Sequence, residues 1–210
     1  MSRLLRYAAI ALGLAAGSFA VARAGLAFAV AYDHVSLVWP SSGLALVALV
    51  LLGLRQFPGL LAGEFAAYAS VGLPPLTAAT MAAGGTLAAL AGAWLLDRAR
   101  GFDPALGRVR DVFRLIFPVA LGAPVIAATI GVASLYEAGR LASDVLVRAG
   151  LTWWAGDVQG VLIFAPFAFA WIARRRPDRH VAAALAHALL IALVLAFGAL
   201  VLEGYLGAEK

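Results

Sequence analysis

Long apolar runs occupy most of this chain, and short segments rich in charged residues, proline or glycine separate them. The pattern predicts helices at residues 4–32, 35–54, 58–72, 76–96, 111–136, 150–173 and 181–205. A helix needs about 20 apolar residues to cross the hydrocarbon core of a bilayer, and most of the runs reach that length. We therefore expect an all-α fold, a polytopic transmembrane helical bundle of about seven helices that forms a single integral-membrane domain over residues 1–210.

Composition strengthens this prediction. Hydrophobic residues make up 64% of the chain and charged residues only 13%, whereas a soluble domain averages about 45–50% and about 25%. The 22 glycines suit the close approach of helices in lipid. So much apolar surface excludes an ordinary soluble domain and makes the lipid bilayer the first expected partner.

Basic residues indicate an orientation in the membrane. The formal net charge is +5, and because its basic residues lie in short loops we expect no nucleic-acid partner. One set of alternate loops holds Arg3, Arg6, Arg55, Arg98, Arg100, Arg108, Arg110, Arg114, Arg174, Arg175, Arg176 and Arg179, and the other holds Arg140, Arg148 and Lys210. The positive-inside rule then places the N-terminus in the cytoplasm. We expect run 4–32 to be a retained span, because no cleavage pattern of a signal peptide follows it.

Catalytic signatures are missing from the sequence. It contains no P-loop, no G-x-S-x-G and no H-E-x-x-H motif. It also has no cysteine, which excludes disulfides, thiolate catalysis and cysteine-rich metal sites. His187 is expected to be a core histidine rather than a haem or metal ligand, since His34 and His180 do not share its depth. We predict that the chain is not an enzyme and has no metal site, and its cofactors stay unknown.

Residues 38–43, V-W-P-S-S-G, interrupt the second apolar run. Pro40 lacks a backbone donor and favours the start of a helix, and Trp39 suits a membrane interface. Free N–H groups together with the Ser41 and Ser42 hydroxyls would form a small polar cup at the positive end of that helix. A helix cap with a tryptophan anchor is the commoner interpretation of such a segment.

Residues 152–160, T-W-W-A-G-D-V-Q-G, open the sixth run. Trp153 and Trp154 fit an aromatic belt. Asp157 lies about two turns inside the helix, where a ligand-linked role and a structural ion pair are equally reasonable. The two glycines are spaced by four residues, which predicts close contact with another helix.

Two more charged residues fall inside apolar runs. Glu64, in the short run 58–72, is expected to extend toward the cytoplasmic interface, with a buried proton site or gate as the alternative. Arg23, in the outer half of the first run, needs a partner in lipid. Asp157 and Asp33 lie at similar depth, and we expect a structural ion pair between Arg23 and Asp157.

The second and sixth runs both begin outside, so their polar residues share a depth. Backbone groups freed by a broken helix must be satisfied by protein, water or ligand, and aromatic walls with a few polar groups are typical of small-molecule pockets. The alternative is a tryptophan belt and one ion pair with no cavity between them. The expected ligand-binding residues are Trp39, Ser41, Ser42, Trp153, Trp154, Asp157 and Gln159.

Several motifs resemble, in the right order, those of the membrane-associated sensor domain family, type one (the MASE family). W-P-S-S-G-L-A at 39–45 corresponds to its W-P-x-S-G-L-A signature, and W-W-A-G-D at 153–157 with Gly160 to its W-W-x-G-D-x-x-G block. The resemblance covers roughly residues 35–170 and includes F-P-G at 57–59, G-A-W-L-L at 92–96, G-F-D-P-A-L at 101–106, R-D-V at 110–112 and A-P at 165–166. The chain departs from the family at 85–88, where G-T-L-A replaces the frequent N-T-L-E, and it is expected to lack the family's eighth span.

The resemblance implies a sensory input domain of bacterial inner membranes, which usually precedes a histidine kinase or diguanylate cyclase module. We therefore expect a sensor in two-component or cyclic di-GMP signalling. It would detect a small ligand or membrane state through an outer polar pocket and signal to a cytoplasmic module or partner. A homodimer is left open. The alternatives are a small-solute carrier or substrate-binding membrane subunit, which could use the same broken helix and buried aspartate, and a scaffold for another membrane protein.

Overall fold

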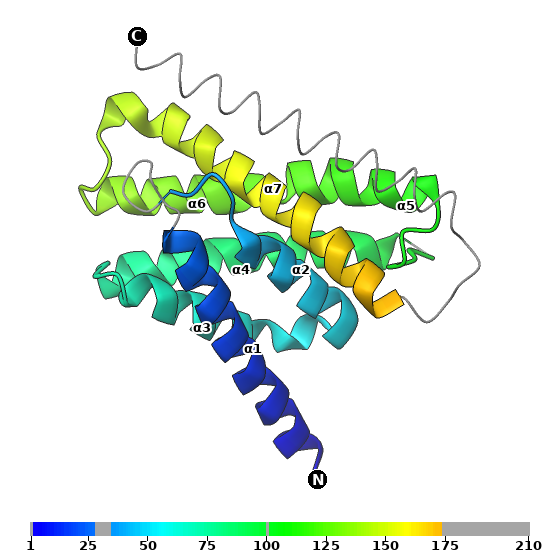
Figure 1. Cartoon of the computed structure of the whole chain (residues 1–210). Helices are drawn as coiled ribbons and strands as arrows, with labels where there is room; N and C mark the ends of the chain where they lie inside the picture. Colours follow the sequence, from blue (N-terminus) through cyan, green and yellow to red (C-terminus); the bar gives the residue numbers. More distant parts are fainter. Residues whose placement is uncertain (1, 28–34, 100, 174–210) are drawn as a thin grey trace.

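The computed structural model describes residues 2–27, 35–99 and 101–173. Every element in this part of the chain is a helix, which confirms the all-α class there (Figure 1). The predicted run 181–205 lies outside the described residues. The elements in chain order are α1 (Arg3–Ala27), α2 (Pro40–Leu52), the 3₁₀ turn η1 (Leu54–Gln56), α3 (Phe57–Ala69), α4 (Pro75–Arg98), α5 (Val109–Arg114), the π-helix η2 (Leu115–Gly122), α6 (Pro124–Glu137), the 3₁₀ turn η3 (Ser143–Val145) and α7 (Leu146–Ala173).

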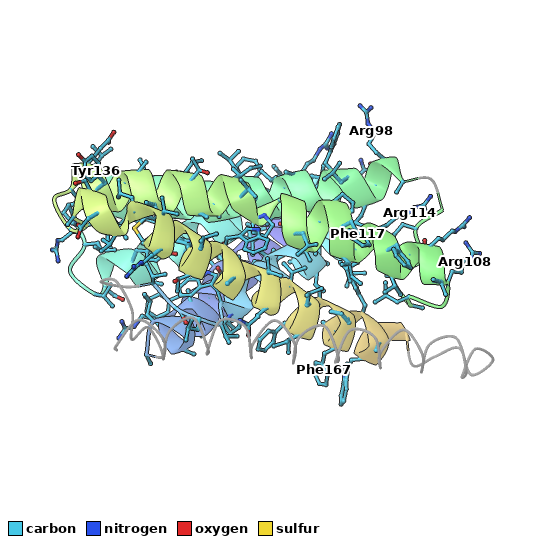
Figure 2. The ribbon with its side chains drawn as sticks, turned by 90° about the horizontal axis from the view of Figure 1, so that it is seen from above. Arg98, Arg108, Arg114, Phe117, Tyr136 and Phe167 are labelled. Carbon is cyan, nitrogen blue, oxygen red and sulfur yellow. The ribbon has the colours of Figure 1, made fainter. Side chains whose placement is uncertain are left out.

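Among the described residues, three stretches are long and apolar enough to cross a membrane: α1, α4 and the continuous stretch from α5 through η2 to α6. Helix α2 is equally apolar in character but shorter. Large apolar side chains such as Phe117 also lie on the outside of the bundle, and Figure 2 shows Phe167 pointing away from it. Their exposed fractions are 56% and 67%, as expected for a surface that faces lipid.

Helix α2 begins at Pro40, five residues later than the predicted run 35–54. Proline fixes its own φ and disfavours helical backbone in the residue before it, and Trp39 accordingly has φ −114° and ψ 87°. Residues 35–39 therefore remain outside the helix. Pro40, which favours the start of a helix, is the sequence signal for this boundary, although the predicted run 35–54 begins earlier.

Helices α1 and α3 pack through small residues. Gly59 and Gly63 of α3 face the backbone carbonyls of Ala11 and Ala15 of α1, and a Cβ atom at either glycine would overlap with the carbonyl oxygen. This spacing of four residues on both helices lets their backbones approach closely. The first turns of α1 extend beyond the other helices (Figure 1), and residues 2–9 are exposed.

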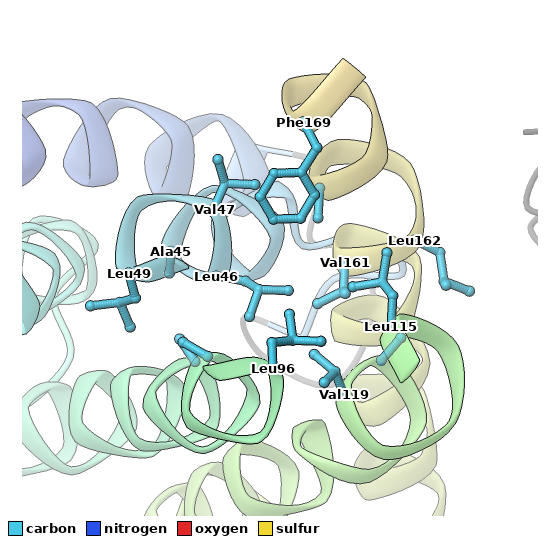
Figure 3. Close-up of a cluster of buried hydrophobic side chains, with 14 of the residues drawn as sticks. Ala45, Leu46, Val47, Leu49, Leu96, Leu115, Val119, Val161, Leu162 and Phe169 are labelled. Atoms are coloured by element: carbon cyan, nitrogen blue, oxygen red, sulfur yellow. The ribbon is translucent and has the colours of Figure 1, made fainter. Parts of the chain in front are cut away.

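The main apolar core surrounds α2. Leu46 and Leu49 of α2, Leu115 of η2 and Phe169 of α7 are fully buried and belong to one cluster. Figure 3 shows Leu46, Leu115 and Val161 directed toward the space between α2, η2 and α7. A second cluster of buried residues includes Trp39, Tyr68 and Trp153. The two clusters therefore lie toward opposite ends of α2.

The π-helix η2 interrupts the stretch between α5 and α6. Pro118 lies inside it, and the N–H of Ala123 donates to the carbonyls of Pro118 (3.2 Å) and Val119 (3.3 Å). The indole N–H of Trp154 on α7 donates to the carbonyl of Leu121 at 2.8 Å. Irregular backbone inside the bundle thus finds a side-chain donor on the neighbouring helix, as an apolar environment requires.

Arginines gather at one end of the bundle. Figure 2 shows Arg98, Arg108 and Arg114 at that end and Tyr136 at the opposite end. The buried carboxylate of Asp111 pairs with Arg114 at 3.2 Å, and the Arg98 guanidinium lies 4.7 Å from the centre of the Trp94 ring. The described part of the chain therefore has a basic end around the connection between α4 and α5.

Candidate functional site

The extended segment 36–39 attaches to α7 through backbone hydrogen bonds. The Trp39 N–H donates to the Gly156 carbonyl at 2.9 Å. The Gln159 side-chain amide donates to the Leu37 carbonyl at 3.1 Å. These bonds satisfy part of the backbone that Pro40 leaves outside the helix, in a region where unpaired polar groups are costly.

Two glycines of α7 make room for this segment. A Cβ atom at Gly156 would overlap with the Ser36 carbonyl oxygen, and one at Gly160 with the Trp39 carbonyl oxygen. The expectation that this glycine pair brings in another helix holds in part, because the non-helical segment 36–39 packs on both glycines and helix α2 follows directly from it. Gly43, one turn into α2, also faces α7 closely, since a Cβ atom there would overlap with the Gly160 carbonyl oxygen.

Two buried carboxyl groups meet the first turn of α2. The Ser41 hydroxyl donates to Oε1 of Glu64 on α3 at 2.7 Å, and the Ser42 hydroxyl donates to Oδ1 of Asp157 on α7. Glu64 and Asp157 are each only 3% exposed. The positive end of a helix favours anionic groups, so α2 holds two carboxyls from two different helices at its N-terminus.

Glu64 was not among the expected ligand-binding residues, and a buried position was only the alternative interpretation of it. The expectation that it extends to the cytoplasmic interface is wrong, because α3 turns this side chain inward between α2 and α4. Gly85 of α4 provides the space: a Cβ atom there would lie 2.7 Å from Glu64 Oε2. Tyr68 follows Glu64 by four residues, and this spacing was the signal that both lie on one face of α3.

Aromatic rings enclose the two carboxyls. Trp39 stacks on Tyr68 with ring centres 5.8 Å apart and planes 2° from parallel. The Trp39 indole also interacts with Glu64, and the Trp153 indole with Asp157. Each carboxyl nevertheless keeps one buried oxygen, Glu64 Oε2 or Asp157 Oδ2, without a hydrogen-bond partner.

Two of the predicted residues lie elsewhere. Arg23 is exposed on α1, and within residues 2–27, 35–99 and 101–173 the structure shows no ion pair between it and Asp157. The alternative partner Asp33, like His187, lies outside the described residues. Trp154 points to Leu121, because neighbouring residues of a helix differ by about 100° around its axis. The structure thus brings together Trp39, Ser41, Ser42, Trp153, Asp157 and Gln159, and adds Glu64 and Tyr68.

Little open space remains in this cluster. A cavity of about 20 Å³ lies beside Ser42, Gly85 and Asp157, and another of about 10 Å³ lies between Trp39, Tyr68 and Trp153. One water molecule needs roughly 10–15 Å³ by the same measure. In this conformation the first cavity admits a group about the size of one water, and a larger organic molecule would require the helices to move.

Comparison with known proteins identifies the family. The MASE1 family model matches residues 10–206, nearly the whole chain. No curated protein and no solved structure matches the chain significantly. The family match confirms the resemblance carried by the two tryptophan motifs, which supply the segment 36–39 and the glycine pair that receives it. The chain therefore belongs to the MASE1 family of membrane-associated sensor domains.

Proposed function

We propose that this chain is the sensory input domain of a bacterial signalling system, set in the inner membrane as a multi-pass bundle. Its N-terminus and arginine-rich end face the cytoplasm, following the positive-inside rule. It detects a small ligand or a membrane state at the cluster around the α2 N-terminus. It passes the change to a cytoplasmic kinase or cyclase module or partner, and it performs no catalysis itself.

One observation carries the proposal: successive serines, Ser41 and Ser42, bind carboxyls from two different helices. A hydrogen bond to a charged group contributes about 1.5–3 kcal/mol, and coupling between distant sites is typically about 1–3 kcal/mol. A stimulus that altered either bond would therefore change the preferred arrangement of α2, α3 and α7 by enough to signal.

A packed path leads from this cluster to the basic end. The core around α2 continues from Leu46 to Phe169 near the end of α7. The Phe169 ring meets the Phe102 ring edge-on, with centres 6.2 Å apart. Phe102 belongs to the connection between α4 and α5, so a shift of α2 against α7 reaches the loop that we place in the cytoplasm.

The test is a fluorescent label in that loop. The chain has no cysteine, so Ala105→Cys gives a single attachment point for a polarity-sensitive dye on protein in lipid nanodiscs. Removing one site bond with Ser42→Ala should change the emission of the dye. The control is Thr152→Ala, which removes an exposed hydroxyl from the same helix as Asp157 and should leave the emission unchanged. Equal emission in all three proteins would contradict transmission from the site to the loop.

A carrier remains the second candidate, because polar groups at an interrupted helix also suit a transport site. A carrier exposes its site to the two sides of the membrane in turn. Ser42→Cys in sealed vesicles should then react with impermeant reagents added on either side. Reaction from both sides would favour the carrier, and reaction from at most one side favours the sensor.

A further inference from the structure

The charge balance of the cluster is incomplete. Glu64 and Asp157 are both 97% buried, and no lysine or arginine is buried anywhere in residues 2–27, 35–99 and 101–173. Tyr68 is the other titratable group that faces the two carboxyls, and Arg23 of α1 is exposed. Buried carboxylates without a counter-ion are costly at membrane depth. A bound cation would remove that cost.

The unpartnered oxygens belong to residues at or next to one cavity. Ser42 occupies Oδ1 of Asp157 and Ser41 occupies Oε1 of Glu64, whereas Oδ2 and Oε2 have no hydrogen-bond partner. Oε2 lies against Gly85, and Gly85 lines the cavity of about 20 Å³ together with Ser42 and Asp157. The rest of the cavity wall is apolar. Asp157 and the Ser42 residue therefore line a space about the size of one water molecule, and the free oxygen of Glu64 lies next to Gly85 in its wall.

The size and the chemistry of this space restrict the ligand. Oxygen ligands favour hard cations over transition metals. Mg²⁺ usually keeps several of its waters and Ca²⁺ takes six to eight oxygen ligands, more than this cavity can supply. An organic ammonium group is larger than the space of about one water.

We propose that this cavity takes up a single small monovalent cation between Glu64 and Asp157. The cation is a proton or a sodium-sized alkali ion, and in both cases its charge neutralises the buried carboxyl pair. Uptake removes negative charge from the N-terminus of α2 and changes what Ser41 and Ser42 bind. The cation would be the ligand of the sensor, and this role rests on the proposed function.

The experiment measures thermal unfolding of the whole chain in detergent, followed by tryptophan fluorescence. NaCl replaces choline chloride at constant ionic strength, first at fixed pH and then across a pH series without sodium. A saturating rise of the midpoint with sodium identifies the alkali ion, since a ligand that binds only the folded state stabilises it. If the cation is a proton, the pH series shows it instead. Folding then takes up a proton, so the equilibrium constant for unfolding falls by up to about tenfold for each pH unit by which the pH is lowered.

Three variants establish the site. The double variant Glu64→Gln with Asp157→Asn should lose the response, while Asp97→Asn, which changes an exposed carboxyl, should keep it. If the double variant does not fold, Gly85→Ala keeps both carboxyls and places a methyl group 2.7 Å from Glu64 Oε2. A sodium response should then weaken at least tenfold in apparent affinity, and a proton response should move to higher pH because the methyl group desolvates the carboxyl. A wild type that responds to neither cation, or a response unchanged in these site variants, overturns the proposal. Because the readout is binding and not signalling, that result leaves the sensory role standing.

Discussion

Replacing Gly160 by alanine tests whether α7 holds the extended segment 36–39. The new Cβ atom would overlap with the Trp39 carbonyl oxygen and lie 2.8 Å from its carbonyl carbon. Both atoms are backbone, so the segment cannot give way by rotating a side chain and must move away from α7. That movement also strains the Trp39–Gly156 and Gln159–Leu37 hydrogen bonds.

The magnitude follows from three contributions. Overpacking costs about 1–3 kcal/mol, and each of the two hydrogen bonds contributes about 0.5–1.5 kcal/mol. Alanine returns up to about 1 kcal/mol because it suits a helix better than glycine. The Gly160→Ala variant should therefore lose about 1–6 kcal/mol of unfolding free energy.

The matched control lies on the same helix. A Cβ atom at Gly150 would meet only Val132 Cγ2, at an ordinary contact distance of 3.9 Å, so Gly150→Ala should be neutral or stabilising by up to about 1 kcal/mol. The assay is equilibrium unfolding in mixed micelles with increasing denaturing detergent, followed by tryptophan fluorescence. If Gly160→Ala is no less stable than Gly150→Ala, the carbonyl of Trp39 does not pack on α7 as described.

Three further predictions follow from other parts of the molecule. Cysteines introduced singly as Ala105→Cys and Ser143→Cys should react with an impermeant reagent from opposite sides of the membrane, and labelling of both from one side contradicts the proposed topology. Gly131→Ala should lower the unfolding free energy by about 1–3 kcal/mol through overpacking, because the Trp153 ring packs directly on Gly131. It should also shift the tryptophan emission in detergent, and unchanged emission would argue against that contact. Purified protein should show no hydrolysis or cyclisation of ATP or GTP above a protein-free control, since the sequence has no phosphate-binding motif, and measurable turnover refutes this.

Sequence reasoning worked best for which residues lie at the same level along the bundle. The lengths of the apolar runs and the position of Pro40 placed Trp39, Ser42 and Asp157 at one level, and the structure brings them together. Gln159 was also expected there and reaches the same segment through Leu37. These residues were accessible to prediction because each lies near the start of a run whose direction the basic loops indicate.

The side of each helix that faces the interior of the bundle was much harder to predict. Helix α3 is apolar nearly all round, F-P-G-L-L-A-G-E-F-A-A-Y-A, so no amphipathic stripe showed which way Glu64 points. Arg23 was paired with Asp157 on depth alone, although it is exposed on α1. Trp154 has the depth of the site and still faces Leu121. In lipid both the inside and the outside of a helix are apolar, which removes the pattern that usually reveals its orientation.

The sequence separations within the cluster impose an order on its assembly during synthesis. The Ser41–Glu64 bond joins residues 23 positions apart, and the Ser42–Asp157 bond joins residues 115 positions apart. At roughly 5–20 residues per second, Asp157 leaves the ribosome roughly 6–23 s after Ser42. Throughout that interval the segment 36–39 lacks Gly156 and Gln159 as partners, while α1 to α4 can already assemble around Glu64. Helix α7 therefore joins a bundle that is only partly assembled. In the cell, substitutions in α7 should first lower the number of nascent chains that complete insertion and escape membrane proteases.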